Sequence, residues 1–74
     1  MEPIGNKLEG QTKVRWFKPR FGYGFLEGDN EDIFVHSSVI SMEGYKTLKA
    51  GQTVTYEAYQ TNDGVRATKV TPIG

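Results

Sequence analysis

The sequence predicts an all-β domain in which five short strands close into a small barrel. No segment carries an apolar stripe with the 3.6-residue period of a helix of ten or more residues. Short runs rich in β-branched and aromatic residues recur instead between turn signals. At 74 residues, the chain has the length of one small domain. The expected strands are Lys13–Lys18, Tyr23–Leu26, Ile33–His36, Thr53–Gln60 and Val65–Thr71.

Turn residues separate these strands. Pro19 cannot donate a hydrogen bond to a strand partner, so it marks the end of the first strand. Asn62-Asp63-Gly64 favours a tight hairpin between the last two. A helical turn is expected near Ser37–Ile40. Residues 1–9 have weak patterning, so we expect a flexible N-terminal tail there and the folded domain at residues 10–74.

The composition argues against several functional classes. With no cysteine and one histidine, His36, the chain offers no disulfide framework and no thiolate or multi-histidine metal site, so we expect no cofactor. No Ser, Cys or carboxylate is paired with His36 at a recognisable spacing, so no enzymatic activity or small-molecule substrate is expected. The first fifteen residues lack the apolar run of a secretory signal, and no window resembles a spanning helix. We expect a cytoplasmic monomer with no membrane partner.

Charge is balanced overall but segregated along the chain. Nine basic and nine acidic residues cancel, which argues against binding of nucleic acid by bulk charge alone. Residues 1–20 carry five basic and two acidic side chains, whereas residues 21–45 carry five acidic and no basic ones. Four cations bracket Trp16-Phe17, namely Lys13, Arg15, Lys18 and Arg20, and four acids crowd one expected loop, namely Glu27, Asp29, Glu31 and Asp32.

Two neighbouring strands carry aromatic residues at alternate positions. Because side chains alternate between the faces of a strand, one face would hold rings and the other aliphatic residues. The first face carries Tyr23, Phe25, Phe34 and His36, and the opposite face carries Gly24, Leu26, Ile33 and Val35. A chain this short, with no amphipathic helix to cover a second face, can bury only one of them. We expect the aliphatic face to form the barrel core and the rings to meet water.

An exposed row of rings edged by cations is suited to single-stranded nucleic acid, because every base offers a π-face and every phosphate a charge. A second class remains open: a small SH3-like barrel whose rings bind an extended or proline-rich peptide. A third interpretation concerns the fold, since Gly22–Leu26 partly matches the ring-bearing strand of the RNA-recognition motif. Only about twenty residues precede this stretch, too few for the strand, helix and strand that come before it in that fold.

The first expected strand presents a conflict of alternation. Strict alternation places Trp16 on the same face as Val14, which is expected in the core, and places Arg15 beside Phe17. Strong coiling or a β-bulge would let Val14 and Trp16 point to different environments.

Three segments with their spacing resemble the cold-shock domain family. They are Lys13-Val14-Arg15-Trp16-Phe17, then Gly22-Tyr23-Gly24-Phe25, then Asp32-Ile33-Phe34-Val35-His36, and the similarity extends over residues 12–71. The resemblance implies a five-stranded antiparallel Greek-key barrel of the OB-fold class. It also implies a bacterial cold-shock protein that binds single-stranded RNA and DNA with low sequence specificity and acts as an RNA chaperone.

The resemblance also implies which residues bind. The family's stacking positions fall on Trp16, Phe17, Tyr23, Phe25, Phe34, His36 and Tyr45, and the expected phosphate contacts are Lys13, Arg15, Lys18, Arg20 and Arg66. Four departures from the family pattern affect this set. Ser37 stands where many bacterial members have phenylalanine, and Asp63 replaces an arginine for which Arg66 could substitute. Lys18 replaces a usual asparagine and Phe21 a usual lysine, changes that alter the loop beside the rings and could add a charge or a ring to it.

Overall fold

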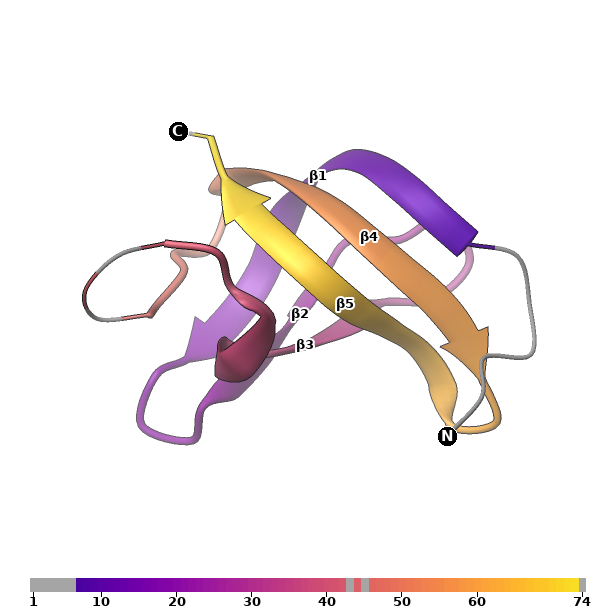
Figure 1. The fold of residues 1–74 in the computed structure, drawn as a ribbon, viewed down its shortest axis with the longest axis horizontal. Helices are drawn as coiled ribbons and strands as arrows, with labels where there is room; N and C mark the ends of the chain where they lie inside the picture. Colours follow the sequence, from indigo (N-terminus) through magenta and orange to yellow (C-terminus); the bar gives the residue numbers. More distant parts are fainter. Residues whose placement is uncertain (1–6, 43, 45, 74) are drawn as a thin grey trace.

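Five strands close into a twisted barrel in the computed structural model, which describes residues 7–42, 44 and 46–73 (Figure 1). The strand order around the barrel is β1-β2-β3-β5-β4. A single 3₁₀ turn, η1 (Ser37–Val39), follows β3 and confirms the helical turn expected there. The strands are β1 (Lys7–Lys18), β2 (Tyr23–Leu26), β3 (Ile33–His36), β4 (Thr53–Thr61) and β5 (Gly64–Pro72).

Neighbouring strands are antiparallel except at one seam. The pairs β1–β2, β2–β3, β1–β4 and β4–β5 are antiparallel, whereas β3 and β5 run parallel over a short contact in which Phe34 pairs with Arg66. This seam closes the sheet. The architecture is the Greek-key barrel of the OB-fold class, as the sequence predicts.

β1 is longer than the sequence predicts. It begins at Lys7, and its first half pairs with β4 from Lys7 opposite Tyr59 to Lys13 opposite Thr53. Residues 7–9, expected in a flexible tail, are therefore part of the sheet, and residues 1–6 lie outside the described residues. Lys7–Gln11 is exposed, so it shows none of the apolar alternation by which a strand is recognised in a sequence. In Figure 1 the strand curves so that one half lies along β4 and the other along β2.

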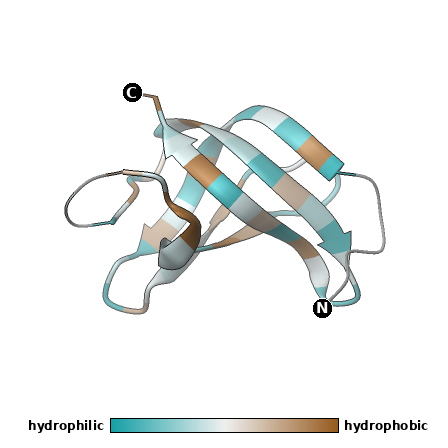
Figure 2. Cartoon of the chain, viewed as in Figure 1, coloured by the Kyte–Doolittle hydropathy of each residue, from teal (hydrophilic) through white to brown (hydrophobic). Residues whose placement is uncertain are grey.

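The core is aliphatic, as expected from the alternation in β2 and β3. Leu26, Ile33 and Val35 are almost completely buried, while Tyr23, Phe25 and Phe34 on the opposite face are partly exposed. Figure 2 shows hydrophobic and hydrophilic residues alternating along β5, which completes the same core. The buried set is Val14, Phe17, Leu26, Ile33, Val35, Ile40, Leu48, Val54, Ala58, Val65, Ala67 and Val70.

A β-bulge in β1 resolves the conflict of alternation at Trp16. Val14 lies opposite Leu26, but Trp16 lies opposite Phe25, so two steps along β1 match one step along β2. The extra residue is Arg15. Val14 therefore faces the core with 1% exposure, and Trp16 turns to the face that carries Phe25.

The same shift turns Phe17 inward, onto Gly24. Phe17 lies opposite Gly24 and is only 9% exposed. A Cβ added to Gly24 would lie 2.6 Å from Phe17 Cα and 2.8 Å from Phe17 Cδ1, and would also meet the carbonyl oxygen of Trp16. Gly24 thus provides the space that the Phe17 ring and the β1 backbone occupy.

We predict that Gly24→Ala lowers the free energy of unfolding by about 2–3 kcal/mol, because the added methyl group overlaps β1. Gly51→Ala is the control, since a Cβ there meets nothing within 4 Å and costs only the strain of a residue with φ +85°, about 1 kcal/mol. Urea denaturation measures both. Equal losses for the two variants would contradict the role assigned to Gly24.

Candidate nucleic-acid interface

Four rings form one outward-facing group on β1, β2 and β3. The register aligns Trp16, Phe25 and Phe34 in one row across the three strands, and places Tyr23 two residues from Phe25 on the same face. All four are partly exposed. We call Trp16, Tyr23, Phe25 and Phe34 the platform.

Each ring of the platform contacts two others in it. Trp16 lies 5.9 Å from Tyr23 and 5.3 Å from Phe25, measured between ring centroids. Phe34 closes the group, at 5.8 Å from Tyr23 and 5.7 Å from Phe25. Such contacts hold the rings in place while leaving their outer surfaces open to water.

His36 extends the platform along β3. It is exposed and lies opposite Tyr23 in the β2–β3 pairing. Its Nδ1 accepts a hydrogen bond from the Ser38 backbone N–H at 3.1 Å. This bond leaves the proton of a neutral imidazole on Nε2, so His36 presents a ring face and an N–H donor.

Two predicted stacking residues are not part of this surface. Phe17 belongs to the core, because the bulge at Arg15 directs it toward Gly24; we therefore leave it out of the platform. Tyr45 lies outside the described residues.

One exposed ring was not among the predicted stacking residues. Phe21, in the turn between β1 and β2, is 59% exposed, and its ring centroid lies 6.1 Å from that of Tyr23. Phe21 lies in a turn, so the alternation of side chains along a strand could not predict which way its ring points. The only sequence signal was the aromatic residue at a position where the family usually has lysine.

Two of the predicted cations lie against platform rings. The Arg66 guanidinium carbon is 4.9 Å from the centroid of Phe34, across the β3–β5 seam. The Lys18 ammonium is 5.8 Å from the Trp16 ring. Each position combines a positive charge with a flat apolar surface, the pairing that a nucleotide requires.

The other three cations are exposed at the edges of the site. Arg15 at the bulge donates its Nε–H to Asp32 Oδ1 at 2.8 Å, which partly neutralises it while using one of its five donors. Lys13 precedes the bulge on β1, and Arg20 lies in the β1–β2 turn. The structure thus places cations along β1 and around the turn.

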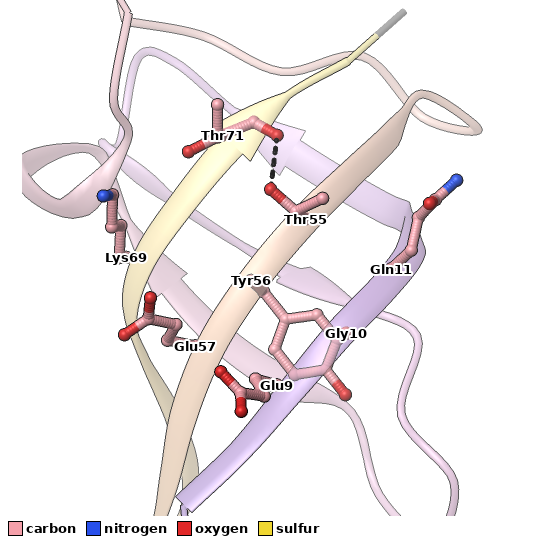
Figure 3. A pocket seen from close by; sticks show the side chains of 8 residues that line it. All are labelled: Glu9, Gly10, Gln11, Thr55, Tyr56, Glu57, Lys69 and Thr71. Carbon is pink, nitrogen blue, oxygen red and sulfur yellow. Dashed lines mark hydrogen bonds between the residues drawn. The ribbon is translucent and has the colours of Figure 1, made fainter.

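A groove of about 470 Å³ lies between β1, β4 and β5, away from the platform (Figure 3). Figure 3 shows Tyr56 lying over Gly10, with the carboxylates of Glu9 and Glu57 at one end of the groove. Lys7 binds both carboxylates, at 3.8 Å and 3.1 Å, and its hydrogen bond to Glu57 raises its pKa above the ordinary value. Two carboxylates and few rings make this groove poorly suited to a polyanion.

Among residues 7–42, 44 and 46–73, no three His, Cys, Asp or Glu side chains come together in a group that could hold a metal ion. None of the helical segments within those ranges is long and apolar enough to cross a membrane.

The comparisons with known proteins agree on one family. The model of the 'Cold-shock' DNA-binding domain matches residues 10–73. The chain belongs to the cold-shock domain family. The cold shock-like protein CspD of Haemophilus influenzae is 50% identical over 62 residues, which cover 81% of this chain and 86% of that protein. The cold shock-like protein of Thermotoga maritima is 49% identical over 59 residues, covering 78% and 89%.

A third cold-shock relative, cold shock protein 2 of Lactiplantibacillus plantarum, is 48% identical over 60 residues, covering 80% of this chain and 91% of that protein. The family assignment confirms the resemblance seen in the hallmark segments, and it makes this chain a nucleic-acid-binding domain by family.

Within this cold-shock domain, Ser37 is partly buried and donates its backbone N–H to the Gly22 carbonyl. Asp63 is exposed in the β4–β5 turn, whereas Arg66 lies beside the platform.

We predict an energetic coupling of about 0.5–1.5 kcal/mol between Tyr23 and Phe34, because their rings are in contact. Tyr23→Ala, Phe34→Ala and the double variant would form a cycle, measured by urea denaturation. Phe21 and Phe25 form the control pair, since the described structure has no ring contact between them. Additive effects of Tyr23→Ala and Phe34→Ala would show that the platform rings do not support one another.

Proposed function

We propose that this cold-shock domain protein binds single-stranded RNA and DNA with low sequence specificity by stacking bases on the platform. The observation that carries the proposal is the contiguous group of partly exposed rings outside a complete aliphatic core. We expect a monomer to bind the nucleic-acid strand, because one copy of the chain supplies all four rings. Every base has a π-face, so the rings select unpaired nucleotides more than particular sequences.

Base stacking can supply enough binding free energy for a protein that has no net charge to attract nucleic acid. Base stacking on an aromatic side chain contributes about 1–3 kcal/mol per base. Four stacked bases give a gross gain of several kcal/mol before ordering costs, enough for roughly micromolar binding. The rings are already held in contact, so little of this gain is lost in ordering them.

The charge distribution defines a path for the sugar–phosphate backbone. Lys18 and Arg20 lie at the β1–β2 turn, at one end of β2, and Arg66 lies beside Phe34. The opposite end of β2 leads into the loop that carries Glu27, Asp29, Glu31 and Asp32. Phosphates are attracted to these cations and repelled by the acidic loop, so the backbone runs between Arg66 at one end of the platform and Lys18 and Arg20 at the other.

Such binding destabilises weak RNA secondary structure without a nucleotide cofactor. A protein that binds unpaired RNA but not the duplex favours the open form by RT ln(1 + [L]/Kd), a few kcal/mol at most. Only marginal hairpins therefore open. This is the action of an RNA chaperone that works by mass action on segments of about 4–8 nucleotides.

The fluorescence of Trp16, the only tryptophan, tests the proposal directly. Titration with oligothymidine quenches it when a base stacks on the indole ring. A proline-rich peptide serves as the parallel titrant, because a peptide-binding barrel is the competing class. Saturable quenching by the peptide, with none by oligothymidine, would overturn the proposal.

We predict that Phe34→Ala weakens oligothymidine binding about 5- to 150-fold, the loss of one stacked base, while the barrel remains folded. Ile73→Ala is the control, because Ile73 is 55% exposed and lies outside the platform. Circular dichroism establishes folding, and quenching of Trp16 gives the affinity. An equal loss of affinity in both folded variants would argue against a role for the platform.

A further inference from the structure

Phe21 is the most exposed large apolar residue among those the structure describes, at 59%. A single exposed apolar side chain is common on protein surfaces. Phe21 differs because it adjoins the platform: its ring is inclined by only 24° to that of Tyr23, with 6.1 Å between their centroids. The two nearly parallel rings present neighbouring flat surfaces, and Tyr23 in turn is inclined by 29° to Phe34.

The turn that carries Phe21 is fixed by backbone hydrogen bonds. The N–H groups of Phe21 and Gly22 both donate to the Lys18 carbonyl at 2.9 Å. The Gly22 carbonyl accepts from the Ser37 N–H at 2.9 Å, which ties the turn to the end of β3. Gly22 has φ +80°, a conformation that favours glycine. Phe21 is thus held at a defined place beside Tyr23, so little ordering is needed when a ligand binds.

The charges around Phe21 suit a nucleotide. Lys18 and Arg20 flank the turn, and both are exposed. Lys18 lies against Trp16, so its charge is directed to the platform side of the turn. The acidic residues of the β2–β3 loop are at the opposite end of β2. A base placed on Phe21 would have its phosphate at the most cationic part of the site.

We propose that Phe21 forms an additional base-binding position, which extends the platform beyond Tyr23 onto the β1–β2 turn. The proposal rests on the proposed function, since the ligand is the next unpaired nucleotide of a strand that already crosses the platform. The path is Phe34, Tyr23 and then Phe21, with Arg66 at one end and Lys18 and Arg20 at the other. Phe21 therefore acts only on strands long enough to reach the turn.

The length of the oligonucleotide provides the test. Oligothymidines of about 3 to 8 nucleotides are titrated into three proteins: the unaltered full chain, Phe21→Leu and Phe21→Trp. Calorimetry measures the affinity of all three. Trp16 fluorescence gives a second measurement for the unaltered chain and for Phe21→Leu. Phe21→Leu keeps an apolar side chain and removes the ring. We expect it to bind the shortest strands as the unaltered chain does and the longer ones about tenfold more weakly, with Phe21→Trp restoring the loss.

Ile73→Ala is the matched control, because Ile73 is 55% exposed and outside the platform; its affinities stay unchanged at every length. Equal affinity of Phe21→Leu and the unaltered chain for all lengths would overturn the Phe21 position while leaving the proposed function intact. If the unaltered chain did not bind oligothymidine of any length, the proposed function itself would be ruled out. Sedimentation of the free proteins completes the test, since a loss of self-association in Phe21→Leu without any change in oligothymidine affinity would identify Phe21 as a contact between copies.

Discussion

The site depends on a constraint of burial: a sheet with two apolar faces in a chain of 74 residues can cover only one of them. The aliphatic face of β2 and β3 closes into the core, and the ring-bearing face is left outside. The β-bulge at Arg15 extends this division to β1, because it allows Val14 to point inward and Trp16 outward. Without that extra residue, either the core would lose Val14 or the platform would lose Trp16.

The division also explains why the exposed rings keep a defined arrangement. Gly24 lies between the two partly exposed rings of β2 and leaves room beneath them for Phe17. The sheet therefore supports the platform from below, while contacts among the rings support it from the side. The cations beside the rings add local positive charge without requiring a net positive protein.

The sequence predicted those parts of the structure that local periodicity determines. Alternation in β2 and β3 identified the core and exposed faces correctly, because a strand has a period of two. The first half of β1 was not predicted, since Lys7–Gln11 is exposed and its pairing with β4 spans about fifty residues of chain. The inward direction of Phe17 depends on the position of the bulge, and the Arg15–Asp32 ion pair joins residues 17 positions apart. Neither follows from the pattern within one strand.

The division between a buried aliphatic face and an exposed ring-bearing face is tested most directly by an NMR titration that follows the aromatic ring protons and the core methyl groups together while oligothymidine is added. Bases that stack on the platform shift the ring protons of Trp16, Tyr23, Phe25 and Phe34, and we expect the methyl signals of Val35 and Val54 to stay unchanged. Shifts confined to the groove around Tyr56, with the platform rings unaffected, would show that the strand does not bind to the platform.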